Sequence, residues 1–207
     1  MPMEAGLATA LGLAMAAGFN AWAAVLVFGG CARLFPALLW GPAADVFRSG
    51  PILTIALFLF VAEFLADKIP LLDHFWNFAH TFLRPAAGAG LALACVPGKS
   101  LIAKIGVAVL GAVVTLVAHM AKATSRLTST AAVSSLRQFS ISIAEDVIAV
   151  SIAAVAIFSP TISLAVLFGV VILMWILFSR VRRAAAILFF AAAHPRRAFR
   201  RKPETAD

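Results

Sequence analysis

Residues 141–178, ISIAEDVIAVSIAAVAIFSPTISLAVLFGVVILMWILF, decide the fold, because they form two apolar runs joined by a Ser-Pro turn. A helix needs about 20 mostly apolar residues to cross a bilayer, and each run is close to that length. The serine and proline between them leave room only for a tight turn. The stretch therefore predicts two consecutive membrane spans, at 141–158 and 162–178.

Four more apolar stretches lie towards the N-terminus, at 6–32, 51–66, 80–96 and 101–120. The stretch at 80–96 contains a proline and two glycines and ends at a Pro-Gly pair, so the sequence leaves open whether it spans the membrane or forms a short, broken or re-entrant helix. The more polar segment 34–50 suits a connector at the membrane surface. The fold class predicted from these stretches is all-α, a polytopic transmembrane helical bundle of about six spans.

The composition of the whole chain agrees with this prediction. Of its 207 residues, 63% are hydrophobic and 13% are charged, and the mean hydropathy is +1.01. A soluble domain of this size needs many more polar residues to cover its surface. The sequence therefore excludes an ordinary water-soluble fold and predicts an integral membrane protein, which we place in the bacterial inner membrane.

The C-terminal end differs from the rest of the chain. We divide the chain into a transmembrane helical domain, 1–179, and a segment, 180–207, that reads as an interfacial helix followed by a polybasic tail. This segment holds eight of the 17 basic residues, so the positive-inside tendency predicts a cytoplasmic C-terminus. With six spans the N-terminus is then cytoplasmic too. We expect the tail to bind anionic lipid headgroups, and we expect no nucleic acid as partner.

Ionisable and amide side chains recur inside the predicted helices, where they are costly and are functional candidates. The helical spacing places several of them on shared faces, and the six-span arrangement brings four helix ends to one region in the cytoplasmic half of the bilayer. We expect this cluster to bind a substrate. Its candidate residues are Asn20, Glu63, Asp67, Asp73, His80, Arg84, His119, Lys122, Glu145 and Asp146.

Recognisable catalytic signatures are missing from the sequence. It has no phosphate-binding loop, no Gly-x-Ser-x-Gly elbow and no His-Glu-x-x-His pair. Cys31 and Cys95 stand in apolar runs, where a small hydrophobic residue is the simplest interpretation. We expect no metal and no cofactor, and no catalytic residue is assigned.

Two groups of motifs resemble a bacterial integral-membrane family known as domain of unknown function 4126. The first group is AEFLADKIP at 62–70 with HTFLRPAAG at 80–88; the second is HMAK at 119–122 with SIAED at 142–146. The resemblance covers nearly the whole chain apart from the basic tail, although segment 127–139 departs from the Pro- and Asn-rich pattern usual in the family. It implies a shared fold but no substrate.

Three functions stay open at this point. The first is a transporter, channel or lipid translocator for a small polar or anionic substrate, in which Arg84 and Lys122 contact the anion and the carboxylates and histidines balance charge or carry protons. The second is a membrane-embedded enzyme that acts on a lipid headgroup or phosphoester. The third is a structural or assembly protein. A homo-oligomeric state is also left open.

Overall fold

The computed structural model describes residues 3–39, 41–66, 70–96, 100–129, 135–172 and 175–176, and these residues are helical apart from short connections. The chain divides into two compact units, Met1–Val170 and Val171–Asp207, and the fold described below is that of the first. The interfacial helix and basic tail predicted at 180–207 lie outside the described residues. All-α architecture is confirmed.

The first apolar stretch forms two helices instead of the single span expected at 6–32. Helix α1 (Met3–Phe19) ends at Asn20, whose backbone is extended (φ −149°, ψ 111°), and α2 (Ala21–Leu34) starts directly afterwards. The Asn20 Oδ1 atom accepts a hydrogen bond from the Ala23 amide at 3.0 Å. An asparagine in this role caps the new helix, because its side chain replaces a missing backbone acceptor.

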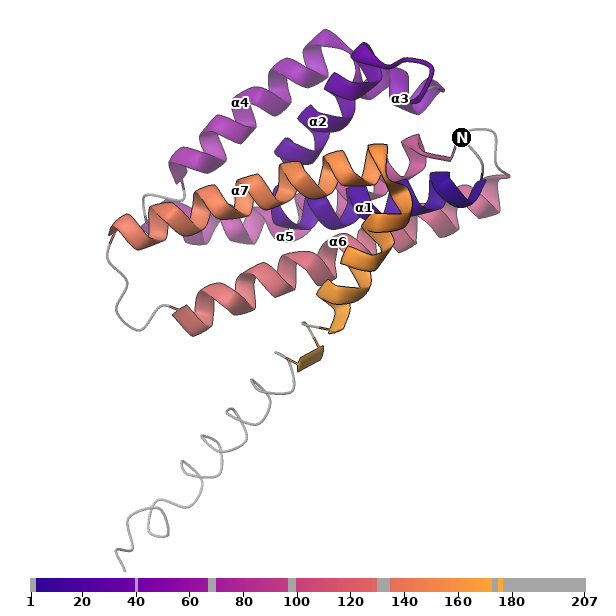
Figure 1. Cartoon of the computed structure of the whole chain (residues 1–207). Helices are drawn as coiled ribbons and strands as arrows, with labels where there is room; N and C mark the ends of the chain where they lie inside the picture. Colours follow the sequence, from indigo (N-terminus) through magenta and orange to yellow (C-terminus); the bar gives the residue numbers. More distant parts are fainter. Residues whose placement is uncertain are drawn as a thin grey trace, which may run out of the picture. The chain divides into compact units, whose positions relative to one another are not determined.

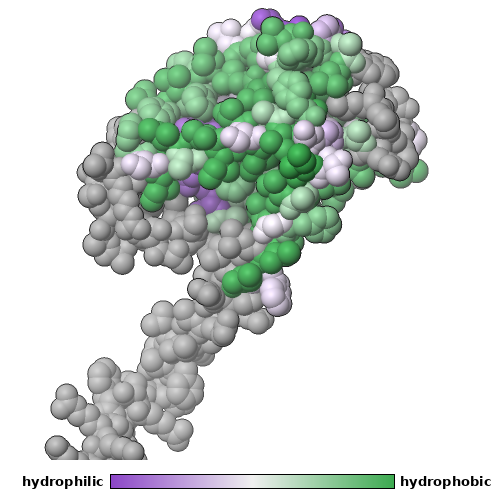
Figure 2. All heavy atoms as spheres, viewed as in Figure 1, coloured by the Kyte–Doolittle hydropathy of each residue, from purple (hydrophilic) through white to green (hydrophobic). Residues whose placement is uncertain are grey.

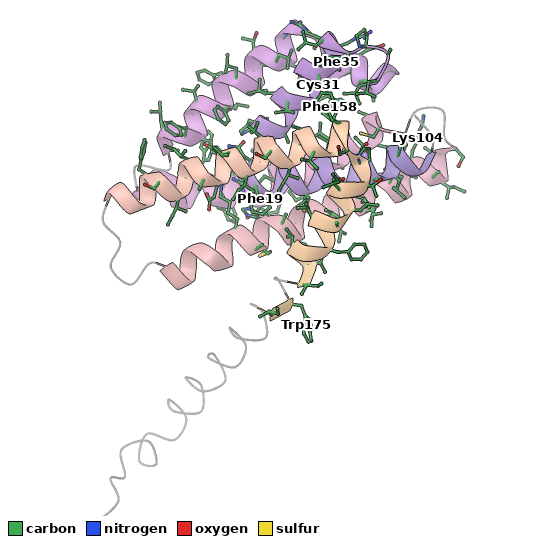
Figure 3. The ribbon with its side chains drawn as sticks, in the orientation of Figure 1. Phe19, Cys31, Phe35, Lys104, Phe158 and Trp175 are labelled. Carbon is green, nitrogen blue, oxygen red and sulfur yellow. The ribbon has the colours of Figure 1, made fainter. Side chains whose placement is uncertain are left out.

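Helices α1 and α2 form a hairpin, because their outer ends return to the same end of the unit. Gly6 of α1 packs against the carbonyl of Cys95, and Phe35 just after α2 packs on Phe158 with ring centroids 5.7 Å apart. Figure 3 shows Cys31 and Phe35 near Phe158, and Phe19 well away from them. Asn20 is therefore the tip of a helical hairpin, so residues 6–32 do not form the single span expected, because the chain turns back at the interruption Gly18-Phe19-Asn20.

The connector contains a short helix, α3 (Pro42–Phe47), and leads into α4 (Gly50–Ala66). Helix α4 packs along α2 (Figure 1). Gly29 of α2 makes this approach close, since a Cβ atom there would lie 2.4 Å from the Phe47 carbonyl oxygen and 2.7 Å from a Leu53 methyl group. The hairpin and α4 thus run beside each other.

Helix α5 (Pro70–Ala94) is continuous through Pro85. At about 1.5 Å per residue its 25 residues extend about 37 Å, which exceeds the thickness of a bilayer core of about 30 Å. Pro85, Gly88 and Gly90 therefore do not break this helix, and a break lies at Asn20 instead. Two further helices, α6 (Leu101–Ser129) and α7 (Ser135–Phe158), follow, and Ser159 separates α7 from the apolar helix Pro160–Ile172.

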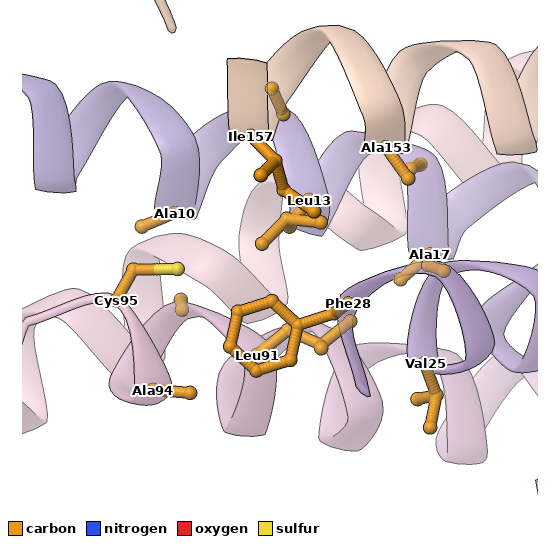
Figure 4. Close-up of a cluster of buried hydrophobic side chains, with 14 of the residues drawn as sticks. Ala10, Leu13, Ala17, Val25, Phe28, Leu91, Ala94, Cys95, Ala153 and Ile157 are labelled. Atoms are coloured by element: carbon orange, nitrogen blue, oxygen red, sulfur yellow. The ribbon is translucent and has the colours of Figure 1, made fainter. Parts of the chain in front are cut away.

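Helix α1 is the centre of the unit, because it packs on α5, α6 and α7 (Figure 1). Its buried positions are mainly alanines, and Figure 4 shows Ala10, Leu13 and Ala17 beside Phe28 and Leu91. Small residues allow helices to approach closely inside membranes, where packing replaces the hydrophobic effect as the main attraction. The core is therefore built from short side chains and close helix contacts.

Large hydrophobic side chains point outwards from this unit. Phe58 on α4 is 71% exposed and Ile102 on α6 is 84% exposed, and hydrophobic residues cover most of the described surface seen in Figure 2. Two helical segments, Leu101–Lys122 and Phe139–Phe158, are long and apolar enough to cross a membrane. Shorter apolar helices are Ala5–Phe19, Ala21–Leu34, Gly50–Ala66 and Pro160–Ile172.

Candidate functional site

The tip of the α1–α2 hairpin collects polar side chains from four other helices. Their positions fall well inside the long helices: Arg84 is in the middle of α5, and His119 is ten residues before the end of α6. We call this group the hairpin-tip cluster; it consists of Asn20, Glu63, His80, Arg84, His119, Lys122, Glu145 and Asp146. All of these except Asp146 are buried.

Two cations bind the end of α1. Where a helix stops, its last carbonyl groups lose their partners and carry the negative end of the helix dipole. Arg84 Nη1 donates to the Gly18 carbonyl at 2.9 Å, and Lys122 Nζ donates to the Phe19 carbonyl at 3.0 Å. The break in the helix is therefore stabilised from α5 and α6 at once.

Each of these cations also has a carboxylate partner. Arg84 Nη2 lies 2.5 Å from Glu63 Oε1, and Lys122 Nζ lies 3.0 Å from Glu145 Oε2. The side chains of the first pair are 1% and 3% exposed, so the charges are almost completely removed from solvent. Buried charges of this kind persist only as pairs, because an isolated one costs several kcal/mol.

A third carboxylate holds the hairpin tip from α7. Asn20 Nδ2 donates to Asp146 Oδ1 at 2.8 Å, while its Oδ1 caps α2. Donor and acceptor ends of the amide are both used, so its orientation is determined. Asp146 therefore links the first turn of α2 to α7.

His80 and His119 each accept a hydrogen bond from a group that can only donate. Trp22 Nε1 donates to His80 Nε2 at 3.3 Å, and Arg84 Nη1 donates to His119 Nδ1 at 2.9 Å. Since indole and guanidinium groups have no acceptor, both receiving nitrogens are unprotonated and both rings are neutral. The other ring nitrogen of His80, Nδ1, lies 3.6 Å from Glu63 Oε1 and 3.5 Å from Arg84 Nη2, and that of His119, Nε2, lies 3.5 Å from the Thr81 hydroxyl oxygen.

Within the part of the chain that the structure describes, three buried polar atoms around this network have no hydrogen-bond partner: Glu63 Oε2, Arg84 Nε and Trp76 Nε1. The first two flank the 2.5 Å ion pair, because each is bonded to the same carbon as a paired atom. Trp76 packs edge-on against His80, with ring centroids 5.5 Å apart. Unpaired buried polar atoms are uncommon and are frequent at functional sites. One acceptor and two donors are thus left open beside Glu63 and Arg84.

Two glycines allow the helices to bring these groups together. A Cβ atom at Gly18 would lie 2.4 Å from Ala118 Cβ, and one at Gly88 would lie 1.8 Å from Thr115 Oγ1. The Thr115 hydroxyl oxygen in turn lies 2.7 Å from the Ala14 carbonyl oxygen. Only glycine fits at positions 18 and 88, so α1, α5 and α6 are in direct contact beside the cluster.

Most of the predicted site residues are brought together, and several of their neighbours carry no pattern in the sequence that predicts them. Trp22, Trp76 and Thr115 were not singled out, although Trp22 follows Asn20 by two residues. Asp67 and the side chain of Asp73 lie outside the described part, so their membership stays a prediction.

The described residues contain no group of three His, Cys, Asp or Glu side chains placed to hold a metal. Cys31 and Cys95 are free thiols. The chemistry available at the hairpin tip is therefore that of paired charges, neutral imidazoles and indole N–H groups. This set can bind a polar or charged group and can exchange protons.

The family model described as Domain of unknown function (DUF4126) matches residues 7–180. No curated protein and no solved structure matches the chain. The matched range includes every residue of the hairpin-tip cluster.

Proposed function

The chain belongs to the DUF4126 family, and from this premise we propose that it is a multi-pass membrane transporter or channel for a small polar or anionic solute, or a lipid headgroup. The observation that supports this most is the break at Asn20, where two buried cations bind the freed end of α1. Broken helices at the centre of a membrane bundle are the places where many transporters bind their substrates. Non-helical backbone is tolerated there only inside protein or along a water-filled path.

The chemistry of the cluster favours an anionic group on the solute. Arg84 and Lys122 are the buried cations, and each is paired with a carboxylate that an anion could replace. Guanidinium and ammonium groups form the strong, charge-assisted hydrogen bonds that bind carboxylates and phosphates. The solute would therefore enter by exchange with Glu63 or Glu145, because a simple addition would leave unpaired negative charge.

The hairpin changes the proposed membrane arrangement at the N-terminus. Gly6 lies beside Cys95, at the same end of the bundle as Phe35, so the start of α1 and the connector face the same side. With a cytoplasmic C-terminus and an inner-membrane location, as we propose, that side is the extracytoplasmic one. This replaces the cytoplasmic N-terminus expected from six spans.

Thiol labelling in whole cells tests this arrangement. Single cysteines at Ala5 and Ser49, in a chain whose native cysteines are replaced by alanine, are expected to react with a membrane-impermeant reagent added outside. A cysteine at Thr205, in the basic tail predicted to be cytoplasmic, is the control and is expected to react only after lysis. Labelling of Ser49 but not Ala5 from outside would contradict the hairpin arrangement.

The two other functions fit the geometry less well. The enzyme has less support, because the sequence carries no recognised catalytic signature and both imidazoles already accept hydrogen bonds from Trp22 or Arg84. A purely structural network would be expected to satisfy its own polar atoms, whereas Glu63 Oε2 and Arg84 Nε have no partner. Transport is compatible with hydrogen-bonded imidazoles and with open polar atoms on Glu63 and Arg84.

Transport itself is tested in proteoliposomes that contain the full chain. We expect uptake of at least one member of a panel of acetate, phosphate, sulfate and phosphoglycerol, and loss of that uptake in Lys122→Gln. Lys104→Gln is the matched control, because Lys104 is an exposed lysine on the same helix. Equal uptake by both variants, or no uptake of any panel member above empty vesicles, would contradict the proposal.

A further inference from the structure

We infer that Glu63 is the proton-exchanging residue of the hairpin-tip cluster and that the proton binds to its Oε2 atom. Glu63 is 2% exposed, against 7% for Glu145, and Asp146 is only partly buried. Its Oε1 atom is bound to Arg84, but Oε2 has no partner among the described side chains. Oε2 is therefore an oxygen on which a proton can bind without displacing an existing hydrogen bond.

The histidines are poorly placed to take this proton. In His80 and His119 the unprotonated nitrogen already accepts a hydrogen bond from an indole or guanidinium N–H group. A proton added there would put two donors against each other, and the ring would have to move first. The open position at Oε2 needs no such rearrangement, so the carboxylate is the better acceptor.

The groups that surround Glu63 connect its protonation to solute binding. Among the described side chains, the charged or titratable groups near it are His80 and Arg84 from α5, with His119 of α6 behind Arg84. When Glu63 is neutral, Arg84 keeps its bonds to Gly18 and His119, and its Nη2 atom becomes available to an anion. The cluster then holds one proton on Glu63 and one anion on Arg84 at the same time.

The step forms one O–H bond on Oε2, takes its proton from water on one side of the membrane and returns it to water on the other. It requires no oxidant and no co-reactant. The role of the proton in transport rests on the proposed function, but the binding of a proton to Glu63 does not. A titratable buried glutamate can therefore be sought without any solute.

Infrared difference spectroscopy of the full chain in lipid nanodiscs, stepped between acid and alkaline buffer, tests this inference with the proton as the only probe. We expect a carboxylic acid C=O band that disappears at alkaline pH. It should fall to background in Glu63→Gln and keep its amplitude in Glu145→Gln, the matched control with the same kind of buried ion pair.

Labelling with ¹³C-glutamate gives a test that does not need the Glu63 variant to fold. Besides Glu63 and Glu145 the chain has glutamates only at 4 and 204. In labelled Glu145→Gln protein the band should shift with the isotope. No titrating band in the wild type, an unshifted band, or a band that persists in Glu63→Gln would overturn the inference. Failure of the uptake assay with the band present would instead count against the transport function.

Discussion

Two ion pairs with the same separation differ in almost every other respect. Arg84 and Glu63 at the hairpin tip are 2.5 Å apart, as are Arg48 and Asp45 beside α3. The first pair is 1% and 3% exposed, whereas the second is 37% and 51% exposed. Water screens and solvates the second pair, so only the first depends on its partners for the stability of its charges. Burial, and not distance, therefore decides what each pair does.

The largest expected effect is that of Arg84→Ala, which leaves the Glu63 carboxylate buried without a cation. Removing one member of a buried pair costs about 3–5 kcal/mol. We expect a loss of that size in the free energy of unfolding, measured by SDS titration in mixed micelles. The double variant Arg84→Met with Glu63→Leu should recover part of the loss, because no charge stays buried. If Arg84→Ala is as stable as the wild type, the difference between the buried and the exposed ion pair is contradicted.

Gly88→Ala sharpens the comparison by separating packing from charge. The added methyl group would lie 1.8 Å from Thr115 Oγ1, so α5 and α6 must move apart. Overpacking of this kind costs about 1–3 kcal/mol. Gly106→Ala is the control, because a Cβ atom at Gly106 meets nothing within 4 Å. If both variants unfold at the same SDS concentration, the close approach of α5 and α6 is contradicted.

Asn20→Ala tests the neutral part of the hairpin tip. The change removes the cap of α2 and the hydrogen bond to Asp146, and loss of a helix cap costs about 0.5–2 kcal/mol. Asn20→Ser retains a capping oxygen but cannot reach Asp146 in the same way, so its loss should be smaller. The same SDS titration distinguishes the two variants. A larger loss in the serine variant would contradict the assigned cap.

Arg48→Ala is expected to have the smallest effect. Exposed ion pairs contribute about 0–1 kcal/mol, so its unfolding curve should nearly overlay that of the wild type. Added salt should reduce the small contribution of the Arg48–Asp45 pair further, because exposed charges are screened. A loss close to that of Arg84→Ala would mean that burial does not separate the two pairs.

The helices and most of the cluster were predictable because they depend on local pattern. Apolar runs gave the start of α6 and the turn at Ser159, and ionisable residues inside those runs identified Glu63, Arg84 and Lys122 as candidates. The hairpin was not predictable, since a break at Gly18-Phe19-Asn20 does not show whether the chain continues or turns back. Pro85 is the opposite case: a proline favours a break in a helix, but α5 continues through it.

The sequence by itself determined that this protein is an apolar, all-helical chain with charges inside its helices, since composition and periodicity act along the chain. Only the tertiary structure decided which charges pair, that α1 and α2 fold back, and that the freed end of α1 lies on Arg84 and Lys122. These outcomes depend on contacts between residues that are far apart in the sequence, from Arg84 and Glu63 with a separation of 21 to Arg84 and Gly18 with a separation of 66. Such contacts are selected by close packing and by the cost of an unpaired buried charge, and neither can be read from local sequence.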